Sequence, residues 1–223
     1  MKILYEDRHL ILCEKPVGVL SQRGKEGESD MLSLLDAYLE EKGERATAYV
    51  LHRLDESVGG LMVYAKHQKA AATMSEIIAR GDMIKEYLAI VEGDLADMGG
   101  EGELFDLLFK DPGKNKSYVV KRVRKGVKEA RLSYRTLGVA EKEGKTLTLV
   151  AVRLYTGRTH QIRVQFSSRR HPLVGDGRYG SKGGKAPALY SYKLTFTHPF
   201  TGKKISISAG MPSGTPWELF DIT

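Results

Sequence analysis

The spacing of apolar and polar positions predicts a chain built mainly of short strands. Two apolar runs, 2–5 and 9–13, are followed by Pro16 and Gly18, which break regular structure, so both runs are predicted strands. Further strands are predicted at 61–65, 84–91, 104–109, 118–120, 130–139, 146–155, 189–196 and 203–208. The sequence Lys-Glu-Gly-Lys at 142–145 favours a hairpin turn between two of these strands.

Three segments have helical periodicity instead. The first helix begins at a cap provided by Ser29 or Asp30, runs to about residue 41 and is followed by Gly43. The second spans 68–80 and ends at Gly81, and the third is a short helix at 160–166 that Thr159 can cap. The expected apolar faces are Met31, Leu34, Leu35 and Tyr38 in the first helix and Ala70, Met74, Ile77 and Ile78 in the second.

This pattern predicts one α+β domain over residues 1–223, with a large mixed, mostly antiparallel sheet flanked by a few helices. No apolar run approaches the roughly 18 residues that span a bilayer, and charge follows the first few residues where a secretory signal would be apolar. Cys13 is the single cysteine, so no internal disulfide can form. A cytoplasmic location is therefore expected. The sequence does not reveal the oligomeric state, for which a monomer is the default.

The net charge of +7 conceals an uneven distribution. Residues 1–109 carry 12 basic and 21 acidic side chains, whereas 110–135 carry 10 basic and 2 acidic, and 153–185 carry 8 basic and 1 acidic. If the fold brings the two basic segments together, they form a footprint for a polyanion. A solvated basic face without a partner fits the same counts.

The segment His52-Arg53-Leu54-Asp55 holds the first candidate for chemistry. It lies where a strand gives way to a loop, and the Gly59-Gly60 pair that follows lets another chain approach the backbone closely. The Asp55 carboxylate could act as a nucleophile or base. Taken alone, it could equally satisfy backbone donors in a turn.

A second candidate, Arg163, lies in the segment 157–164, Gly-Arg-Thr-His-Gln-Ile-Arg-Val. On a helix capped by Thr159, Arg163 lies four residues after the cap and beside His160. A buried guanidinium here could pair with Asp55 and hold that carboxylate ionised and oriented. The alternatives are contacts with phosphates at the surface, or simple solvation of Arg158 and Arg163.

Other chemistries are disfavoured. Gly175, Gly177 and Gly180 have the spacing of a dinucleotide-binding loop, but the Ser-Lys-Gly-Gly-Lys that follows cannot form the helix this loop requires. No Walker-type phosphate loop is present. The six histidines are scattered singly and the cysteine is alone, so no metal site is expected. Glu56 adjoins Asp55 and points to the opposite face of an extended chain, which disfavours a glycosidase pair.

The ordered combination of motifs closely resembles the RluA family of RNA pseudouridine synthases. The blocks that carry the resemblance are 52–61, with His-Arg-Leu-Asp and Gly-Leu, then Lys-Glu-Tyr-Leu at 85–88, then 157–164, then His-Pro-Leu-Val-Gly-Asp and Tyr-Gly within 171–180. The segments 3–7, 15–18 and 194–199 fit the same family. The resemblance therefore covers nearly the whole chain.

The resemblance implies a basic cleft and a reaction without cofactor or metal. It implies that Asp55 attacks, or otherwise assists departure from, the ribose C1′ of a flipped uridine, after which the uracil rotates and rejoins through C5. Tyr87 matches the tyrosine that stacks on the base and helps to remove the C5 proton, and Arg163 matches the arginine that pairs with the aspartate. Arg53 matches an arginine that fills the space the uridine leaves. The remaining residues expected to bind RNA or uridine are Leu54, Arg158, His160 and Leu189.

The chain departs from the family pattern at three places. Val58-Gly59 stands where Thr-Ser is common, Gln165 stands where histidine is usual, and Tyr190-Ser191 replaces His-Ala. None of these removes a catalytic group, so they bear on substrate preference. The small N-terminal RNA-binding module of some members is not expected, because the family pattern begins at residue 3.

Extruding a uridine from paired RNA costs roughly a few kcal/mol, which phosphate contacts from the two basic segments can offset. Ribosomal and transfer RNA both remain open as substrates, as does the modified position. A non-catalytic RNA-binding protein of the same fold is one alternative. A hydrolase that cuts N-glycosidic bonds is another, and it would need a second carboxylate to activate water.

Overall fold

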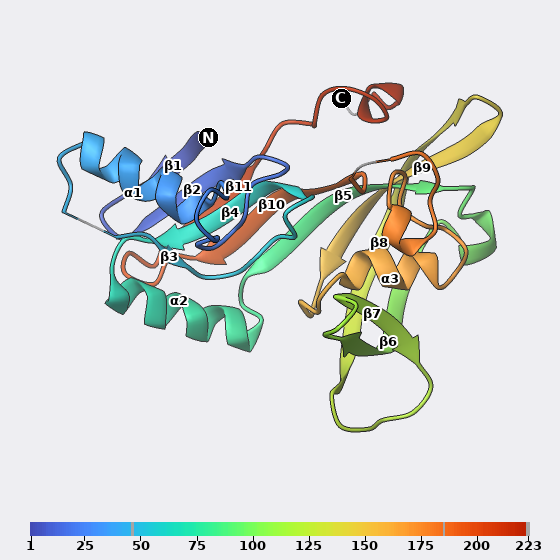
Figure 1. The fold of residues 1–223 in the computed structure, drawn as a ribbon, viewed down its shortest axis with the longest axis horizontal. Helices are drawn as coiled ribbons and strands as arrows, with labels where there is room; N and C mark the ends of the chain where they lie inside the picture. The colour runs from blue at the N-terminus through green and yellow to red at the C-terminus, as the bar shows by residue number, and fades with distance from the viewer. Residues whose placement is uncertain (46, 185, 222–223) are drawn as a thin grey trace. The chain divides into compact units, whose positions relative to one another are not determined.

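The computed structural model describes residues 1–45, 47–184 and 186–221. Within these residues, eleven strands belong to one sheet, accompanied by three α-helices and three short 3-10 helices (Figure 1). Every strand pair whose register is described is antiparallel. The predicted α+β fold is confirmed. The chain divides into two compact units, 1–85 with 191–210 and 86–190 with 211–223, and each is described by itself.

In the first unit the strands hydrogen-bond in the order β1-β2-β4-β10, with β3 on β4 and β11 on β10. The core of this unit is formed by β2 and β4, whose residues are almost all buried. The strands are β1 Lys2–Glu6, β2 Leu10–Lys15, β3 Tyr49–Val50, β4 Gly59–Ala65, β11 Lys204–Ser208 and, from Ser191 onward, β10 Leu189–Thr197.

The first unit also contains the helices α1, Met31–Glu41, and α2, Gln68–Arg80. Asp30 caps α1 as predicted, because its carboxylate accepts a hydrogen bond from the Ser33 backbone N–H at 2.8 Å. His67 caps α2 by accepting from the Ala70 N–H, a role the sequence analysis did not assign. Gly81 ends α2 in the left-handed conformation, as its position predicted.

The buried face of α1 differs from the predicted one. Met31, Leu35 and Leu39 are fully buried, at spacings of four residues, whereas Leu34 is 39% exposed. The buried residues of α1 form one narrow stripe along the helix, and the rest of its surface faces solvent. Leu34 lies beside that stripe, so its predicted place in the core is wrong.

In the second unit the strands hydrogen-bond in the order β5-β9-β8-β6-β7. They are β5 Ile84–Glu92, of which Glu86 onward lies in this unit, β6 Glu101–Asp111, β7 Lys116–Val120, β8 Val127–Lys142 and β9 Lys145–Leu154. The predicted β8–β9 hairpin is confirmed, because Lys142 pairs with Lys145 and both turn residues, Glu143 and Gly144, have positive φ.

The helices of the second unit are short. They are α3 Gln161–Ser167 and the 3-10 helices η1 Ala96–Met98, η2 Gly177–Tyr179 and η3 Trp217–Leu219. The segment 93–102 contains η1 and the first residues of β6. In the described part of the chain, no helix has the length and apolar character needed to cross a membrane.

Candidate active site

The turn that carries Asp55 is fixed by buried hydrogen bonds within the first unit. The Ser21 hydroxyl accepts from the Leu54 N–H at 3.0 Å and donates to the Leu54 carbonyl at 2.8 Å. The turn closes with a bond from the Val58 N–H to the Asp55 carbonyl at 3.0 Å. Leu54 itself is buried, whereas Asp55 is half-buried, so the turn presents the carboxylate from a rigid backbone.

Lys15 stabilises the same turn through hydrogen bonds to backbone carbonyls. Its ammonium is almost fully buried and donates to three backbone carbonyls, those of Pro16 at 2.8 Å, Val19 at 2.7 Å and Glu56 at 3.1 Å. Burial lowers the pKa of Lys15 to about 8, and the nearby carboxylates of Glu56 and Asp55 oppose that shift. Lys15 therefore ties the chain at 16–19 to the residue that follows Asp55.

His52 holds the start of the turn as a neutral ring. Its Nε2 accepts a hydrogen bond from the Val63 N–H at 3.1 Å, which anchors the turn to β4. Burial, reinforced by the charge of nearby Lys85, lowers the pKa of His52 to about 3. Near neutral pH the ring thus serves as a hydrogen-bond acceptor and carries no charge.

The glycine pair after the turn acts as the sequence analysis expected. Gly60 has a φ of +114°, and a Cβ there would collide with the backbone of Ser191 in β10. The Ser191 hydroxyl donates to the Leu61 carbonyl at 2.9 Å, so the close approach of the two strands is secured by a side chain. Arg53, by contrast, is exposed and donates to the Gln22 side chain at 3.3 Å.

Arg163 in the second unit is held by a carboxylate that the sequence analysis assigned no role. The guanidinium is 5% exposed on α3, and its Nε and Nη2 donate to the two carboxylate oxygens of Asp176 at 2.6 and 2.8 Å. Such a bidentate pair fixes both the position and the plane of the guanidinium. The sequence offered one indication of this role, because Asp176 is the single acidic residue in the basic segment 153–185.

Tyr179 also contacts Arg163. The guanidinium carbon lies 5.2 Å from the centre of the Tyr179 ring, which gives a cation–π contact. The Tyr179 hydroxyl lies 3.0 Å from Nδ1 of His160. Two of the predicted site residues, Arg163 and His160, are thus brought together on one aromatic side chain.

The start of α3 is built differently from the prediction. Thr159 does not cap the helix, because His160 occupies the cap position with a φ of +55° and makes no capping bond with its side chain. The Gln161 side chain fixes the preceding turn instead, by accepting from the Arg158 N–H at 3.0 Å and the Thr156 hydroxyl at 2.8 Å.

The remaining predicted residues of the second unit are Tyr87 on β5 and Leu189 at the start of β10, and both are buried. Arg53, Leu54 and Asp55 share one turn in the first unit, whereas Tyr87, Arg158, His160, Arg163 and Leu189 lie in the second unit. The pairing of Asp55 with Arg163 therefore stays a prediction, as do the individual roles of these residues.

The two basic segments lie against each other in the second unit. Arg178 donates to the Asn115 carbonyl at 2.7 Å, Arg158 donates to the Glu129 carbonyl at 2.7 Å, and the Tyr155 N–H donates to the Arg131 carbonyl at 3.1 Å. The fold thus concentrates positive charge from both segments, as the sequence analysis required for a polyanion footprint.

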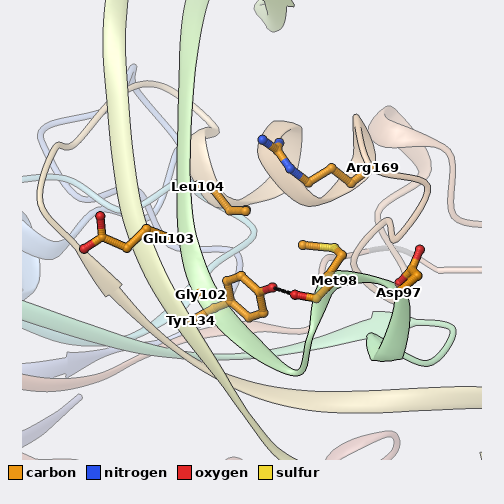
Figure 2. A pocket seen from close by; sticks show the side chains of 7 residues that line it. All are labelled: Asp97, Met98, Gly102, Glu103, Leu104, Tyr134 and Arg169. Atoms are coloured by element: carbon orange, nitrogen blue, oxygen red, sulfur yellow. Dashed lines mark hydrogen bonds between the residues drawn. The ribbon is translucent and has the colours of Figure 1, made fainter.

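The second unit has a hollow of about 470 Å³, and none of the predicted site residues lines it (Figure 2). Two of the residues that line it are joined directly, because the Tyr134 hydroxyl donates to the Met98 carbonyl at 2.6 Å. Its lining is Asp97, Met98, Gly102, Glu103, Leu104, Tyr134 and Arg169. Among the described residues, no cluster of three histidine, cysteine or acidic side chains has a geometry able to hold a metal ion.

Comparison with known proteins shows where this arrangement belongs. The family described as RNA pseudouridylate synthase matches residues 9–168. The RNA pseudouridine synthase YhcT of Bacillus subtilis is 34% identical over 217 residues, which cover 96% of this chain and 69% of that protein. The tRNA pseudouridine synthase C of Haemophilus ducreyi is 32% identical over 227 residues, covering 94% and 90%.

The fold agrees with this result. Human RNA pseudouridylate synthase domain containing 4 has a TM-score of 0.74 at 22% identity, covering 95% of this chain and 88% of its own. The chain belongs to the RNA pseudouridylate synthase family. It is accordingly an isomerase that acts on uridine in RNA, and the resemblance to this family seen in its motifs is confirmed.

Proposed function

We propose that this protein converts specific uridines of structured ribosomal or transfer RNA to pseudouridine through Asp55. The glycosidic bond between C1′ and N1 breaks with assistance from the Asp55 carboxylate, the uracil rotates, and a bond forms between C1′ and C5. The C5 proton is lost and N1 gains a proton, so the product is an isomer of the substrate. This balance requires no oxidant, reductant or added group.

The observation that carries the proposal is the rigid turn that presents Asp55. This turn lies within residues 9–168, which match the RNA pseudouridylate synthase family. The carboxylate is half-buried, and its backbone is tied by Ser21, Lys15 and His52. A nucleophile or general base must be held close to its productive geometry, and a turn fixed by buried bonds provides this. The other acid of the turn, Glu56, is exposed.

Tyr87 and Arg163 supply the rest of the chemistry in this proposal. Tyr87 forms an aromatic wall for the base and assists removal of the C5 proton. The Arg163 guanidinium pairs with Asp55 and favours its ionised form. Because Asp176 already binds two N–H groups of Arg163, that guanidinium is preorganised before RNA arrives.

RNA is held, in this proposal, by the joined basic segments of the second unit together with Arg53, Leu54, Arg158, His160 and Leu189. Named relatives act on both RNA classes, since one is a ribosomal large subunit pseudouridine synthase D and another a tRNA pseudouridine synthase C. A salt-dependent affinity is expected, because phosphate contacts release counterions.

The decisive test compares Asp55→Asn with the wild type on total RNA from cells that lack the gene. Site-resolved mapping should find pseudouridine after treatment with the wild type and none after treatment with the variant, while both bind RNA with similar affinity. Pseudouridine made by Asp55→Asn would remove the assigned role. RNA binding without any product indicates a non-catalytic binding protein, and release of free uracil indicates a hydrolase.

A further inference from the structure

Tyr179 occupies the centre of a buried hydrogen-bond network that the sequence motifs do not explain. Its hydroxyl accepts from the Ser117 N–H at 2.8 Å and lies 3.2 Å from the Ser117 carbonyl and 3.0 Å from Nδ1 of His160. Two cations lie near the centre of its ring: the Arg163 guanidinium carbon at 5.2 Å and the Lys116 ammonium at 4.9 Å. One side chain thereby joins β7 to the first turn of α3.

Neighbouring bonds make the same connection. The Ser117 hydroxyl donates to the Thr159 carbonyl at 2.7 Å, and Lys116 donates to the Arg178 carbonyl at 2.5 Å. Arg178 in turn donates to the Asn115 carbonyl at 2.7 Å. The strand β7 is therefore fastened along its first residues to both the 157–163 segment and the η2 turn.

The strand fastened in this way belongs to the most basic part of the molecule. We define the basic hairpin as residues 107–126, which comprise the C-terminal part of β6, all of β7 and the loop after each of these strands (Figure 1). Its basic residues are Lys110, Lys114, Lys116, Lys121, Arg122, Arg124 and Lys125, against the single acid Asp111. Such a surface favours the phosphates of RNA.

We infer that Tyr179 is a positioning residue that couples RNA held on the basic hairpin to the orientation of Arg163. The inference rests on the proposed function, in which Arg163 serves the reaction. Tyr179 is 6% exposed, so it acts through the groups it binds and not by contact with RNA. Its hydroxyl fastens the hairpin, and its ring, with Asp176, holds the guanidinium.

The two parts of this role separate in two substitutions. Tyr179→Phe keeps the ring beside Arg163 and removes the hydroxyl. The hairpin then loses its bonds to this residue but keeps those of Ser117 to Thr159 and of Lys116 to Arg178, so it is held less firmly and RNA must order it on binding. KM for RNA should rise roughly 3- to 10-fold, the equivalent of one hydrogen bond, while kcat stays within about twofold. Tyr179→Leu removes the ring as well, and kcat should then fall by about tenfold or more.

Tyr134→Phe is the matched control. Tyr134 is buried to a similar extent in the same unit, and its hydroxyl also binds a backbone carbonyl, but that carbonyl belongs to Met98, which lies outside the basic hairpin. Its loss should lower the melting temperature without changing KM or kcat. KM and kcat are obtained from initial rates of pseudouridine formation on RNA from cells that lack the gene. The rates are measured at several salt concentrations.

The slope of log KM against log salt tests whether the substitution changes the number of phosphate contacts. It should be the same for the wild type and Tyr179→Phe, because no phosphate contact is removed. A slope reduced by about 0.7 to 0.9 would show that a lysine or arginine loses its phosphate contact in Tyr179→Phe, so that the hydroxyl sets the RNA contacts themselves, and kinetics identical to those of Tyr134→Phe would show a purely structural role. Either result overturns the inference.

A binding measurement keeps this test independent of the proposed reaction. The affinity of a fluorescent 12-nucleotide uridine oligomer should fall in Tyr179→Phe and hold in Tyr134→Phe. If the wild type makes no pseudouridine but shows this pattern, the proposed function fails while the fastening of the hairpin stands. Equal affinities in both variants would refute the fastening itself.

Discussion

Replacing Asp176 by asparagine tests whether the buried ion pair holds Arg163 as firmly as its geometry indicates. Both side chains are buried, with 6% and 1% of their surfaces exposed, and the two bonds between them measure 2.6 and 2.8 Å. Asparagine keeps the size of the side chain but not its charge. Arg163 then stays charged in the interior without the carboxylate that binds its Nε and Nη2.

The expected loss of stability is large. Removing one partner of a buried pair costs about 3–5 kcal/mol, and Asp176 supplies two charge-assisted bonds to this guanidinium. For 223 residues the entropy of unfolding is about 0.5 kcal/mol per kelvin, so the melting temperature should fall by roughly 6–11 °C. Turnover should fall too, because the plane of the guanidinium is no longer fixed.

Glu103→Gln is the matched control for this substitution. Glu103 binds Arg131 with similar bidentate geometry, at 2.8 to 3.1 Å, but both side chains are half exposed. An exposed pair contributes about 0–1 kcal/mol, so its loss should shift the melting temperature by about 2 °C or less. Scanning calorimetry measures both variants, and equal shifts would refute the claim that burial makes the Asp176 carboxylate indispensable.

Two further predictions concern cationic side chains. Arg163→Lys should lose most turnover, because an ammonium cannot reproduce the two parallel bonds to Asp176; unchanged pseudouridine formation would exclude Arg163 from the site. For Lys15, burial puts the folded-state pKa at about 8, below the unfolded value of 10.5, so the unfolded chain binds more protons between these pH values. The free energy of unfolding of the wild type should therefore rise by about 2 kcal/mol from pH 7.5 to 9.5, and that of Lys15→Met should not. Urea titrations at the two pH values measure both proteins. The same rise in both would contradict the assignment of a buried charge to Lys15.

Local chemistry made much of the secondary structure predictable. The cap at Asp30, the stop at Gly81 and the β8–β9 turn each depend on residues within a few positions, so the sequence alone identifies them. The same holds for Gly60, because a glycine pair directly after the Asp55 turn indicates that another chain approaches the backbone closely. The error at Leu34 arose because apolar character does not say which side of a stripe meets the core.

The connections around Arg163 could not be predicted in this way. Asp176 lies 13 residues after Arg163, and Ser117 lies 62 residues before Tyr179, so no local periodicity relates them. Thr159 had the residue type of a cap, but the Gln161 side chain took over the turn before α3. Tertiary contacts decide such positions, and propensity does not.

The glycines at 175, 177 and 180 acquire their meaning from these contacts. Gly175 has a φ of +79° and packs directly against the backbone of residues 184 and 186, where any side chain would collide. The chain then makes the single turn η2 and leaves it through Gly180 at a φ of +107°, and no helix follows in the described residues 181–184. These residues therefore lack the helix that a dinucleotide-binding loop requires, as the sequence predicted. The tight turn places Asp176 and Tyr179 on the same guanidinium, so the glycine spacing serves to hold a cationic side chain of the protein itself and not a phosphate.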